Sequence, residues 1–324
     1  MQSRDALQPS QRDAKSIVAR DTWVIDGRAI ARAVRREVAA DVARLVAAGI
    51  TPGLSVTLVG DDPASQIYVR GKIRDCEEVG IRSTVTRMPA DTPARVLLDH
   101  IDALNRDDGV DGVLVQLPLP AHIPTLDVVS RVRSDKDVDG FGAPNLGCLV
   151  SGEPGLVACT PGGVMRMLAE VDRAMGGFPL AGRDAVVIGR SRIVGTPMAL
   201  LLLDADASVT VCHHLSRDLR HHVERAELLV VATGARHLIH GSWLKSGAVV
   251  IDVGITRNAD GSLSGDVDFA SALGIAAAIS PVPGGVGPMT RAMLLRNTVD
   301  ACARRRGEAA GLRSAPLTFR ATRP

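Results

Sequence analysis

The sequence predicts an α/β protein of two domains, and three observations lead to this fold class. The chain has 324 residues, a length that two domains usually share. Strand-like apolar runs alternate with segments of helical spacing, first over residues 28–120 and again over residues 185–254. Between these alternations lies a stretch rich in Gly, Pro and Asp, residues 134–163, which is typical of a domain boundary.

The first alternation has the β-α-β-α-β order of a parallel sheet with crossover helices. Pro63 suits the first turn of its second helix, and Asp61 and Asp62 favour the positive end of that helix. The expected elements are a helix over 28–49, a strand over 54–60, a helix from about 63 to 80, a strand over 81–87, a helix near 93–105 and a strand from residue 112.

The second alternation is typical of a doubly wound, Rossmann-like sheet that binds a nucleotide cofactor. A last helix, from about Pro288 to Arg304, is expected to leave this domain and pack back on the first. The expected elements of the sheet are strands over 185–189, 208–212, 227–233 and 248–254, with helices from about 194 and near 216–224.

These elements divide the chain into an α/β substrate and catalytic domain, residues 21–158, and a Rossmann-like cofactor domain, residues 159–287. A C-terminal helix over 288–306 completes the catalytic domain. Residues 1–20 lack the apolar core of a signal peptide, and we expect them to form a flexible extension, like the tail at 307–324.

Composition excludes several classes of function. Aromatic residues make up only 2% of the chain, too few for stacking on single-stranded nucleic acid, and a net charge of +2 implies no polyanionic partner. No apolar run reaches the length of a membrane span. The five cysteines form no C-x-x-C pair, which indicates reduced thiols and a cytoplasmic protein. No metal site is expected, because neither carboxylate nor thiol joins the histidine cluster at ligand spacing: His213, His214, His221 and His222.

Tyr68 and Lys72 are the strongest candidates for chemistry. Tyr68 is the only tyrosine in the chain, and Lys72 is one of four lysines against 34 arginines. Residues four apart share a face of a helix. Arginine cannot give up its proton in a protein, whereas a partly buried lysine can. The pair therefore indicates catalysis, although an exposed lysine beside a half-buried tyrosine would give the same pattern.

A glycine-containing loop, residues 189–197, follows the first strand of the second alternation. Such a loop lets the backbone approach a pyrophosphate at a helix N-terminus. It departs from G-x-G-x-x-G, since Ser191 replaces the middle glycine, so a tight turn without a ligand is the alternative. The next strand ends in Cys212-His213-His214 without the acid that binds the ribose of NAD. Together with Arg190 in the loop, this favours NADP.

Five sequence blocks, taken in order, resemble the bifunctional methylenetetrahydrofolate dehydrogenase/methenyltetrahydrofolate cyclohydrolase family. The resemblance extends over residues 23–305, nearly the whole expected folded part. The blocks are Asp61–Ser65 with Tyr68 and Lys72, Val115–Pro120, Asp135–Phe141, Gly189–Gly195 and Pro281–Thr290.

The resemblance implies a role for each matching residue. Lys72 would be the catalytic amine, held by Gln116, while Tyr68 would lie against the pterin and Asp139 would hold its polar edge. The catalytic residues would thus be Tyr68, Lys72, Gln116 and Asp139. Further contacts to the folate substrate would come from Val115, Leu117, Pro118, Pro283, Gly284 and Gly285. The contacts to NADP would come from Thr160, Gly189, Arg190, Ser191, Ile193, Val194, His213, His214, Thr233, Gly234 and Ile255.

The family also implies the two reactions, oxidation of methylenetetrahydrofolate and hydrolysis of the methenyl product to 10-formyltetrahydrofolate. It further implies a homodimer formed through the cofactor domain, whose strand-rich half, with strands 227–233 and 248–254, is expected to leave an edge strand available. Three positions depart from the family pattern, namely Gly142, Ala158 and His214. Loss of one activity stays open, as do an NADP dehydrogenase of the shikimate kind and a nucleotide sensor without catalysis.

Overall fold

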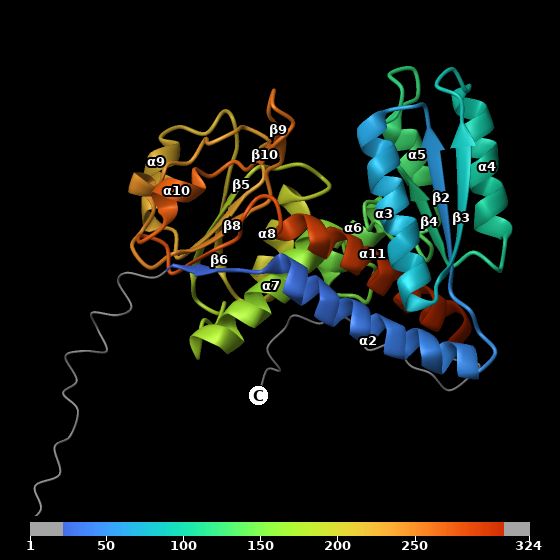
Figure 1. Ribbon diagram of the computed structural model, residues 1–324, viewed down its shortest axis with the longest axis horizontal. Helices are drawn as coiled ribbons and strands as arrows, with labels where there is room; N and C mark the ends of the chain where they lie inside the picture. The colour runs from blue at the N-terminus through green and yellow to red at the C-terminus, as the bar shows by residue number, and fades with distance from the viewer. Residues whose placement is uncertain (1–21, 308–324) are drawn as a thin grey trace, which may run out of the picture.

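The computed structural model describes residues 22–307, so the expectations for the two terminal extensions fall almost wholly outside the described residues. The chain forms two lobes, each with a parallel sheet (Figure 1). The predicted two-domain α/β fold is confirmed. None of the helices within residues 22–307 is long and apolar enough to cross a membrane.

The first lobe contains a three-stranded parallel sheet in the order β3-β2-β4. Every residue of β2 and β4 is buried, as expected for strands covered on both faces. The elements of this lobe are β2 (Gly53–Val59), α3 (Pro63–Val79), β3 (Arg82–Met88), α4 (Ala94–Arg106), β4 (Gly112–Val115) and α5 (Thr125–Arg131).

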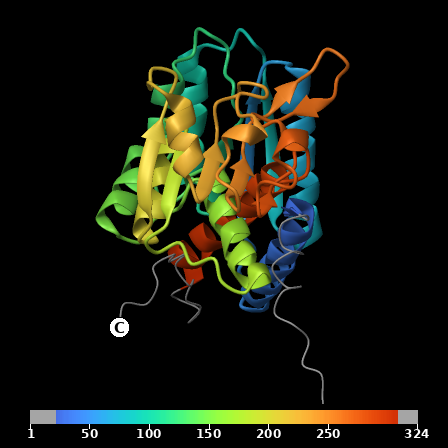
Figure 2. The same ribbon diagram turned by 90° about the vertical axis from the view of Figure 1, so that its left-hand side faces the viewer.

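The second lobe contains a six-stranded parallel sheet in the order β1-β11-β8-β7-β5-β6, whose strands lie side by side in Figure 2. Its strands are β1 (Trp23–Val24), β5 (Asp184–Ile188), β6 (Ser208–Cys212), β7 (Leu228–Val231), β8 (Val249–Asp252) and β11 (Ala278–Ile279). Its other elements are α7 (Cys159–Met175), α8 (Gly195–Asp204), α9 (Leu219–Arg225), α10 (Phe269–Ala272), a 3-10 turn (Gly241–Trp243) and the hairpin of β9 (Thr256–Arg257) and β10 (Leu263–Ser264).

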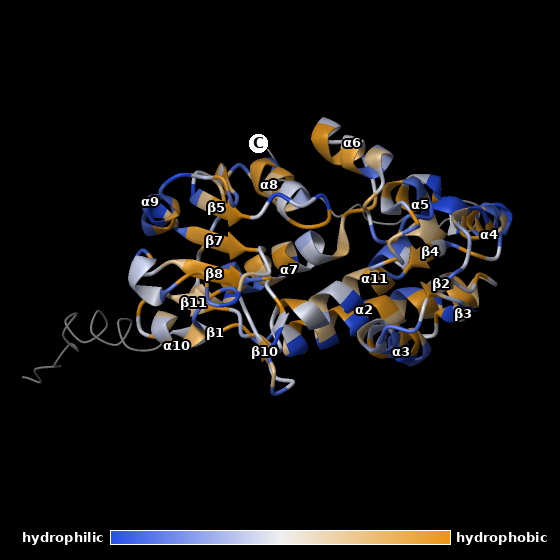
Figure 3. Cartoon of the chain, turned by 90° about the horizontal axis from the view of Figure 1, so that it is seen from above, coloured by the Kyte–Doolittle hydropathy of each residue, from blue (hydrophilic) through white to orange (hydrophobic). Residues whose placement is uncertain are grey.

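Aliphatic side chains fill the interior of both lobes. Figure 3 shows this division, with orange strands β5, β7 and β8 inside and blue, hydrophilic colour on the outer helices α3, α4 and α9. The core residues are almost all Val, Leu, Ile, Met and Ala, as the low aromatic content requires.

Two long helices connect the lobes. α2 (Gly27–Ala47) starts beside the larger sheet and runs along α3 of the first lobe. α11 (Val286–Cys302) packs against both α2 and α7, and a π-helical turn (Ala303–Gly307) follows it. α11 also contacts α3, β2 and β4, so the last helix packs on the first lobe as well.

Three expectations differ from the structure. The strand Trp23–Val24 falls in the expected catalytic domain, yet it pairs with β11 of the larger sheet. The stretch expected to be loop contains α6 (Ala143–Ser151) and the start of α7. An available edge strand was expected in the half that holds β7 and β8, but each of these two strands has a neighbour on both sides, and the edges of the sheet are β1 and β6.

Candidate active site between the lobes

The start of α3 is fixed by local sequence, and this places Tyr68 and Lys72. The Asp62 carboxylate accepts a hydrogen bond of 2.7 Å from the Ser65 backbone N–H, and Pro63 occupies the first helical turn. The helix ends at Gly80, whose φ of 83° is readily adopted only by glycine. Tyr68 and Lys72 lie one turn apart on this helix and therefore share a face of it.

Lys72 reaches the end of strand β4. Its Nζ donates a hydrogen bond of 3.0 Å to Oε1 of Gln116, the residue that follows β4. The Gln116 side chain is itself fixed, since its Nε2 donates to the Leu117 carbonyl at 2.7 Å. The amide therefore holds the amine with an uncharged acceptor, the arrangement that the family resemblance implies. Leu117 precedes Pro118 in the same turn after β4.

Asp139 lies near Lys72, in a turn built around Asp137. The Asp137 carboxylate accepts hydrogen bonds from the backbone N–H groups of Gly140 and Gly142, at 3.1 and 2.7 Å. Burial raises the pKa of the Asp139 carboxyl to about 6, and the neighbouring Lys72 ammonium opposes only part of this shift. Asp139 lines a small cavity together with Val115 and Leu117, so these three predicted substrate residues lie together.

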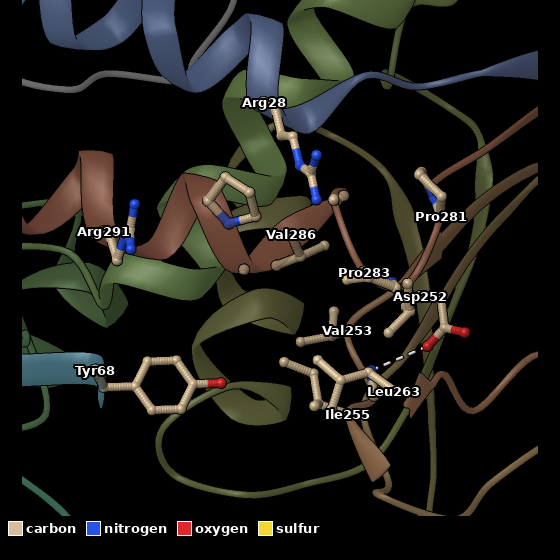
Figure 4. Close-up of a pocket in the computed structure, with 16 residues that line it drawn as sticks. Arg28, Tyr68, Asp252, Val253, Ile255, Leu263, Pro281, Pro283, Val286 and Arg291 are labelled. Atoms are coloured by element: carbon tan, nitrogen blue, oxygen red, sulfur yellow. Dashed lines mark hydrogen bonds between the residues drawn. The ribbon is translucent and has the colours of Figure 1, made fainter. Parts of the chain in front are cut away.

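A cleft of about 290 Å³ lies between α3 and the carboxyl ends of β8 and β11. Tyr68, 44% exposed, points across it toward Ile255 and Leu263 (Figure 4). The predicted substrate residues Pro283, Gly284 and Gly285 line the same cleft from the other lobe. Thus Tyr68, Ile255 and this segment line one cleft, whereas Asp139, Val115 and Leu117 line the smaller cavity. Lys72 lies one helical turn from Tyr68 and is hydrogen-bonded to Gln116.

The glycine-containing loop joins β5 to α8. Gly189 has φ 120°, and a Cβ there would lie 2.2 Å from the Ala232 carbonyl oxygen. A Cβ on Gly195 would lie 2.1 Å from the Gly189 oxygen, so both positions require glycine. Ser191 Oγ accepts from the backbone N–H of Val194 at 3.2 Å, which shapes the loop. Arg190 and Ile193 are exposed in it.

The other predicted cofactor residues follow neighbouring strands of the larger sheet. His213 and His214 come after β6, Thr233 and Gly234 after β7, and Ile255 after β8. The ends of β5 and β7 flank the point where strand order reverses, which is where doubly wound sheets bind nucleotides. The glycine-lined loop, the start of α8 and the exposed Arg190 therefore suit a dinucleotide with a charged phosphate.

Most of the predicted cofactor residues lie outside the cleft that contains Tyr68 and the segment Pro283–Gly285. The residues of the loop at 189–194 and the two histidines do not line the 290 Å³ cleft. Thr160 lies at the start of α7, where its hydroxyl forms a hydrogen bond of 2.9 Å with the Thr290 hydroxyl of α11. Within residues 22–307, no group of three or more His, Cys, Asp or Glu side chains is arranged to hold a metal ion.

Sequence reasoning missed several residues of the cleft. Arg28, at the start of α2, and Arg291, on α11, point into it (Figure 4). Arg291 is paired with buried Asp75 of α3 at 2.9 Å. Asp252 and Leu263 also line the cleft. Arg28 reaches the cleft because β1 pairs with β11, a contact between residues about 250 apart in sequence that no local pattern indicates.

Family models match both lobes. The one described as "Tetrahydrofolate dehydrogenase/cyclohydrolase, catalytic domain" matches residues 25–139. The one described as "Tetrahydrofolate dehydrogenase/cyclohydrolase, NAD(P)-binding domain" matches residues 158–306. The Bifunctional protein FolD of Bordetella petrii is similar throughout, with 53% identity over 298 residues that cover 92% of this chain and 100% of that protein.

Solved structures share the fold. The bifunctional FolD methylenetetrahydrofolate dehydrogenase/cyclohydrolase of Campylobacter jejuni has a TM-score of 0.85 and 44% identity, covering 88% of this chain and 99% of its own. The corresponding enzyme of Trypanosoma brucei, solved with NADP cofactor and an inhibitor, has a TM-score of 0.82 and 38% identity, covering 88% of this chain and 98% of its own.

Proposed function

Because the chain belongs to the tetrahydrofolate dehydrogenase/cyclohydrolase family, we propose that it performs both reactions at the cleft beside Lys72. It oxidises 5,10-methylenetetrahydrofolate with NADP and hydrolyses the 5,10-methenyl product to 10-formyltetrahydrofolate. The observation that carries this proposal is the 3.0 Å hydrogen bond between Lys72 and Gln116, one helical turn from Tyr68 and beside Asp139.

In the first reaction the chain's task is to position the folate. Tyr68 offers an aromatic face for the pterin, and Asp139 offers oxygen acceptors for the donor-rich edge of that ring. The segment Pro283–Gly285 closes the opposite wall of the cleft. Bound NADP supplies the acceptor for hydride. The alignment that these groups impose accounts for the rate of this step, since no proton carrier is required.

In the second reaction water adds to the methenyl cation and a ring C–N bond breaks. The attacking water must lose a proton and the departing ring nitrogen must gain one, so a group that accepts and returns a proton lowers both barriers. Lys72 is the amine beside the folate cleft, and Gln116 fixes its position without a negative charge. We assign the proton transfer to Lys72.

NADP would lie along the carboxyl edge of the larger sheet. Gly189 and Val194, in the loop between β5 and α8, would hold the phosphates, and Thr233, Gly234 and Ile255 would contact the cofactor after β7 and β8. Arg190 offers a cation for the 2′-phosphate, since within residues 22–307 its exposed guanidinium makes no ion pair. Preference for NADP over NAD rests on this arginine and on the absence of an acid after β6.

We also infer a cytoplasmic homodimer joined through the cofactor domain. Strand β6 is an edge of the larger sheet, and an unpaired edge favours pairing with another chain. Exposed apolar side chains lie on and beside it, namely Val211, Leu203 and Leu215. β6 replaces the strands that sequence favoured for this interface.

The direct test is to supply purified protein with methylenetetrahydrofolate and either NADP or NAD. We expect reduced NADP and 10-formyltetrahydrofolate in equal amounts, with less turnover on NAD. In a second assay, methenyltetrahydrofolate alone should be hydrolysed faster than in buffer. Absence of both turnovers, with folate or NADP still bound, would favour a sensor over an enzyme.

A further inference from the structure

Two buried carboxylates lie behind the cofactor edge of the larger sheet, and the proposed chemistry does not use them. Asp266 is fully buried and Asp252 is 3% exposed. They belong to different segments, since Asp252 ends β8 and Asp266 lies in the segment between β10 and α10. Among residues 22–307, neither has a basic side chain as its partner, so backbone and hydroxyl groups must compensate the cost of burying them.

Asp266 holds the turn that follows β7. Its Oδ2 accepts three hydrogen bonds, from the Thr233 backbone N–H at 2.6 Å, the Thr233 hydroxyl at 2.8 Å and the Gly234 N–H at 3.0 Å. Its Oδ1 is buried without a hydrogen-bond partner. One oxygen of a buried acid therefore fixes the two residues to which a cofactor contact has been assigned.

Asp252 holds the next turn and links it to Asp266. Its Oδ1 accepts from the Gly254 N–H at 2.9 Å and from the Asp266 N–H at 3.0 Å, while its Oδ2 accepts from the Val267 N–H at 2.8 Å. Figure 4 shows the bond to Gly254 at the wall of the cleft. The Asp252 N–H in turn donates to the Ser280 hydroxyl at 2.8 Å, at the end of β11.

Neighbouring glycines leave space for both carboxylates. A Cβ on Gly265 would lie 2.0 Å from Asp252 Oδ2, and a Cβ on Gly254 would lie 2.1 Å from Asp266 Oδ1. Any side chain at either position would displace an acid. The packing around the pair therefore leaves room for both acidic side chains only because glycine occupies these two positions.

We propose that Asp252 and Asp266 are positioning residues for the cofactor, and that they act on hydride transfer and not on hydrolysis. The pair joins the ends of β7, β8 and β11, so it sets where Thr233, Gly234 and Ile255 lie. This inference rests on the proposed function, in which those residues contact NADP.

The selectivity follows from geometry. The groups assigned to hydrolysis, Lys72, Gln116 and Asp139, are held by α3, β4 and the Asp137 turn of the other lobe. None of them contacts Asp252 or Asp266 through a hydrogen bond. A shift of the turns after β7 and β8 would therefore misplace the nicotinamide end of the cofactor and leave the hydrolytic groups in place.

Asp266→Asn in the full chain tests the proposal, because it removes the charge and keeps the shape. NADP dissociation constants are measured by calorimetry, dehydrogenase kcat and KM are measured with NADP varied, and cyclohydrolase kcat/KM is measured without cofactor. We expect the NADP Kd and KM to rise about tenfold or more, because charge-assisted acceptors are lost. Cyclohydrolase kcat/KM should stay within about twofold.

Asp268→Asn is the matched control, because Asp268 is only two residues from Asp266. Its carboxylate accepts a hydrogen bond from the Ser271 N–H at the start of α10 and takes no part in the hydrogen bonds of Asp252 and Asp266. Asp268→Asn should leave both activities near wild type. Asp252→Asn is the second variant, for use if Asp266→Asn does not fold. Because Asp252 also lines the folate cleft, this variant is scored by its NADP Kd alone, which should rise as in Asp266→Asn.

An unchanged NADP Kd in both Asp266→Asn and Asp252→Asn overturns the proposal. An equal loss of dehydrogenase and cyclohydrolase activity in Asp266→Asn also overturns it, because a purely structural role would affect both reactions alike. Wild-type protein without NADP reduction would instead contradict the proposed function itself.

Discussion

Substitution of Lys72 is expected to affect the two reactions most differently. Lys72→Met keeps the bulk of the stem and removes the amine. Cyclohydrolase kcat should fall roughly a hundred- to ten-thousand-fold, the usual effect of losing a general acid or base. Dehydrogenase activity should fall less, since hydride transfer needs alignment only. Stopped-flow assays of each step with wild-type and variant protein measure this difference.

The conservative variant and a control complete that experiment. Lys72→Arg should also lose cyclohydrolase activity, because a guanidinium stays protonated at any working pH. Lys245→Met is the matched control, as Lys245 lies on the far lobe, 3.8 Å from Glu227. Full cyclohydrolase turnover in the Arg variant would mean that Lys72 supplies only positive charge.

The ionised Asp139 carboxylate is expected to lower the stability of the fold while it binds the substrate. Its folded pKa of about 6 lies above the ordinary value of 3.8, so its contribution to stability is present at low pH and is lost as pH rises from about 4 to about 6. Asp139→Asn should therefore stabilise the protein by about 3 kcal/mol at pH 8, with no gain below pH 4. Denaturant unfolding at both pH values measures this change.

The same substitution should weaken folate binding. An amide replaces one acceptor oxygen with a donor, which opposes the donor-rich edge of a pterin. Wild-type kcat/KM for the folate should fall as pH drops through about 6, where the carboxylate is protonated, and the variant should lack this limb. Unchanged folate KM in Asp139→Asn would remove Asp139 from the substrate site.

Arg190 is the residue expected to distinguish NADP from NAD. Arg190→Ala should weaken NADP by roughly 1.5–3 kcal/mol and NAD far less, because only NADP carries the 2′-phosphate. Arg192→Ala, two residues along the same exposed loop, is the control. Calorimetric titration of each variant with NADP and with NAD shows which arginine binds the 2′-phosphate. A selective loss of NADP affinity in Arg192→Ala alone would assign the role to Arg192.

At the scale of elements, the edge strand β6 is expected to form the dimer interface. Val211 is 41% exposed on this edge strand, so Val211→Lys places a charge in the inferred interface. We expect wild-type protein to sediment as a dimer at micromolar concentration and the variant as a monomer that keeps cyclohydrolase activity. Val96→Lys, on the outer helix α4 of the other lobe, where Val96 is 50% exposed, is the charge-matched control. A monomeric wild type at that concentration would rule out the dimer.

Elements with strong local signals were predictable from the sequence. The strand over 208–212 has the observed bounds, and the helix from Pro63 to Gly80 differs only at its last residue, because a proline, an N-cap and a terminal glycine mark its ends. α6 was missed since Gly147 and Pro144 resemble loop residues, although Pro144 lies in its first turn and Gly152 follows its end.

Sheet edges could not be predicted, because strand order depends on contacts between distant segments. β11 has only two residues and carries no pattern of its own, yet it lies between β1 and β8 and shifts the sheet edge to β1. β8 is therefore an internal strand, since β11 covers the side that β7 leaves open.

At the scale of the whole molecule, some site residues could be predicted from the sequence, and others could not because they depend on contacts between distant segments. Tyr68, Lys72, Gln116 and Asp139 were identified by residue chemistry together with family resemblance. Arg28 and the Asp252–Asp266 pair depend on β1 pairing with β11 and on turns of the folded sheet, so nothing local in the sequence indicates them. The cleft exists only because α2 and α11 hold the two lobes together.

The central claim is that one cleft serves both reactions, and inhibition by one unreactive folate analogue tests it most directly. Its inhibition constant is measured against the dehydrogenase and against the cyclohydrolase, at the same NADP concentration and pH. A shared cleft beside Tyr68 and Lys72 predicts equal constants for the two reactions. Constants that differ by more than about tenfold, equivalent to about 1.4 kcal/mol, would mean two separate folate sites and would contradict the claim.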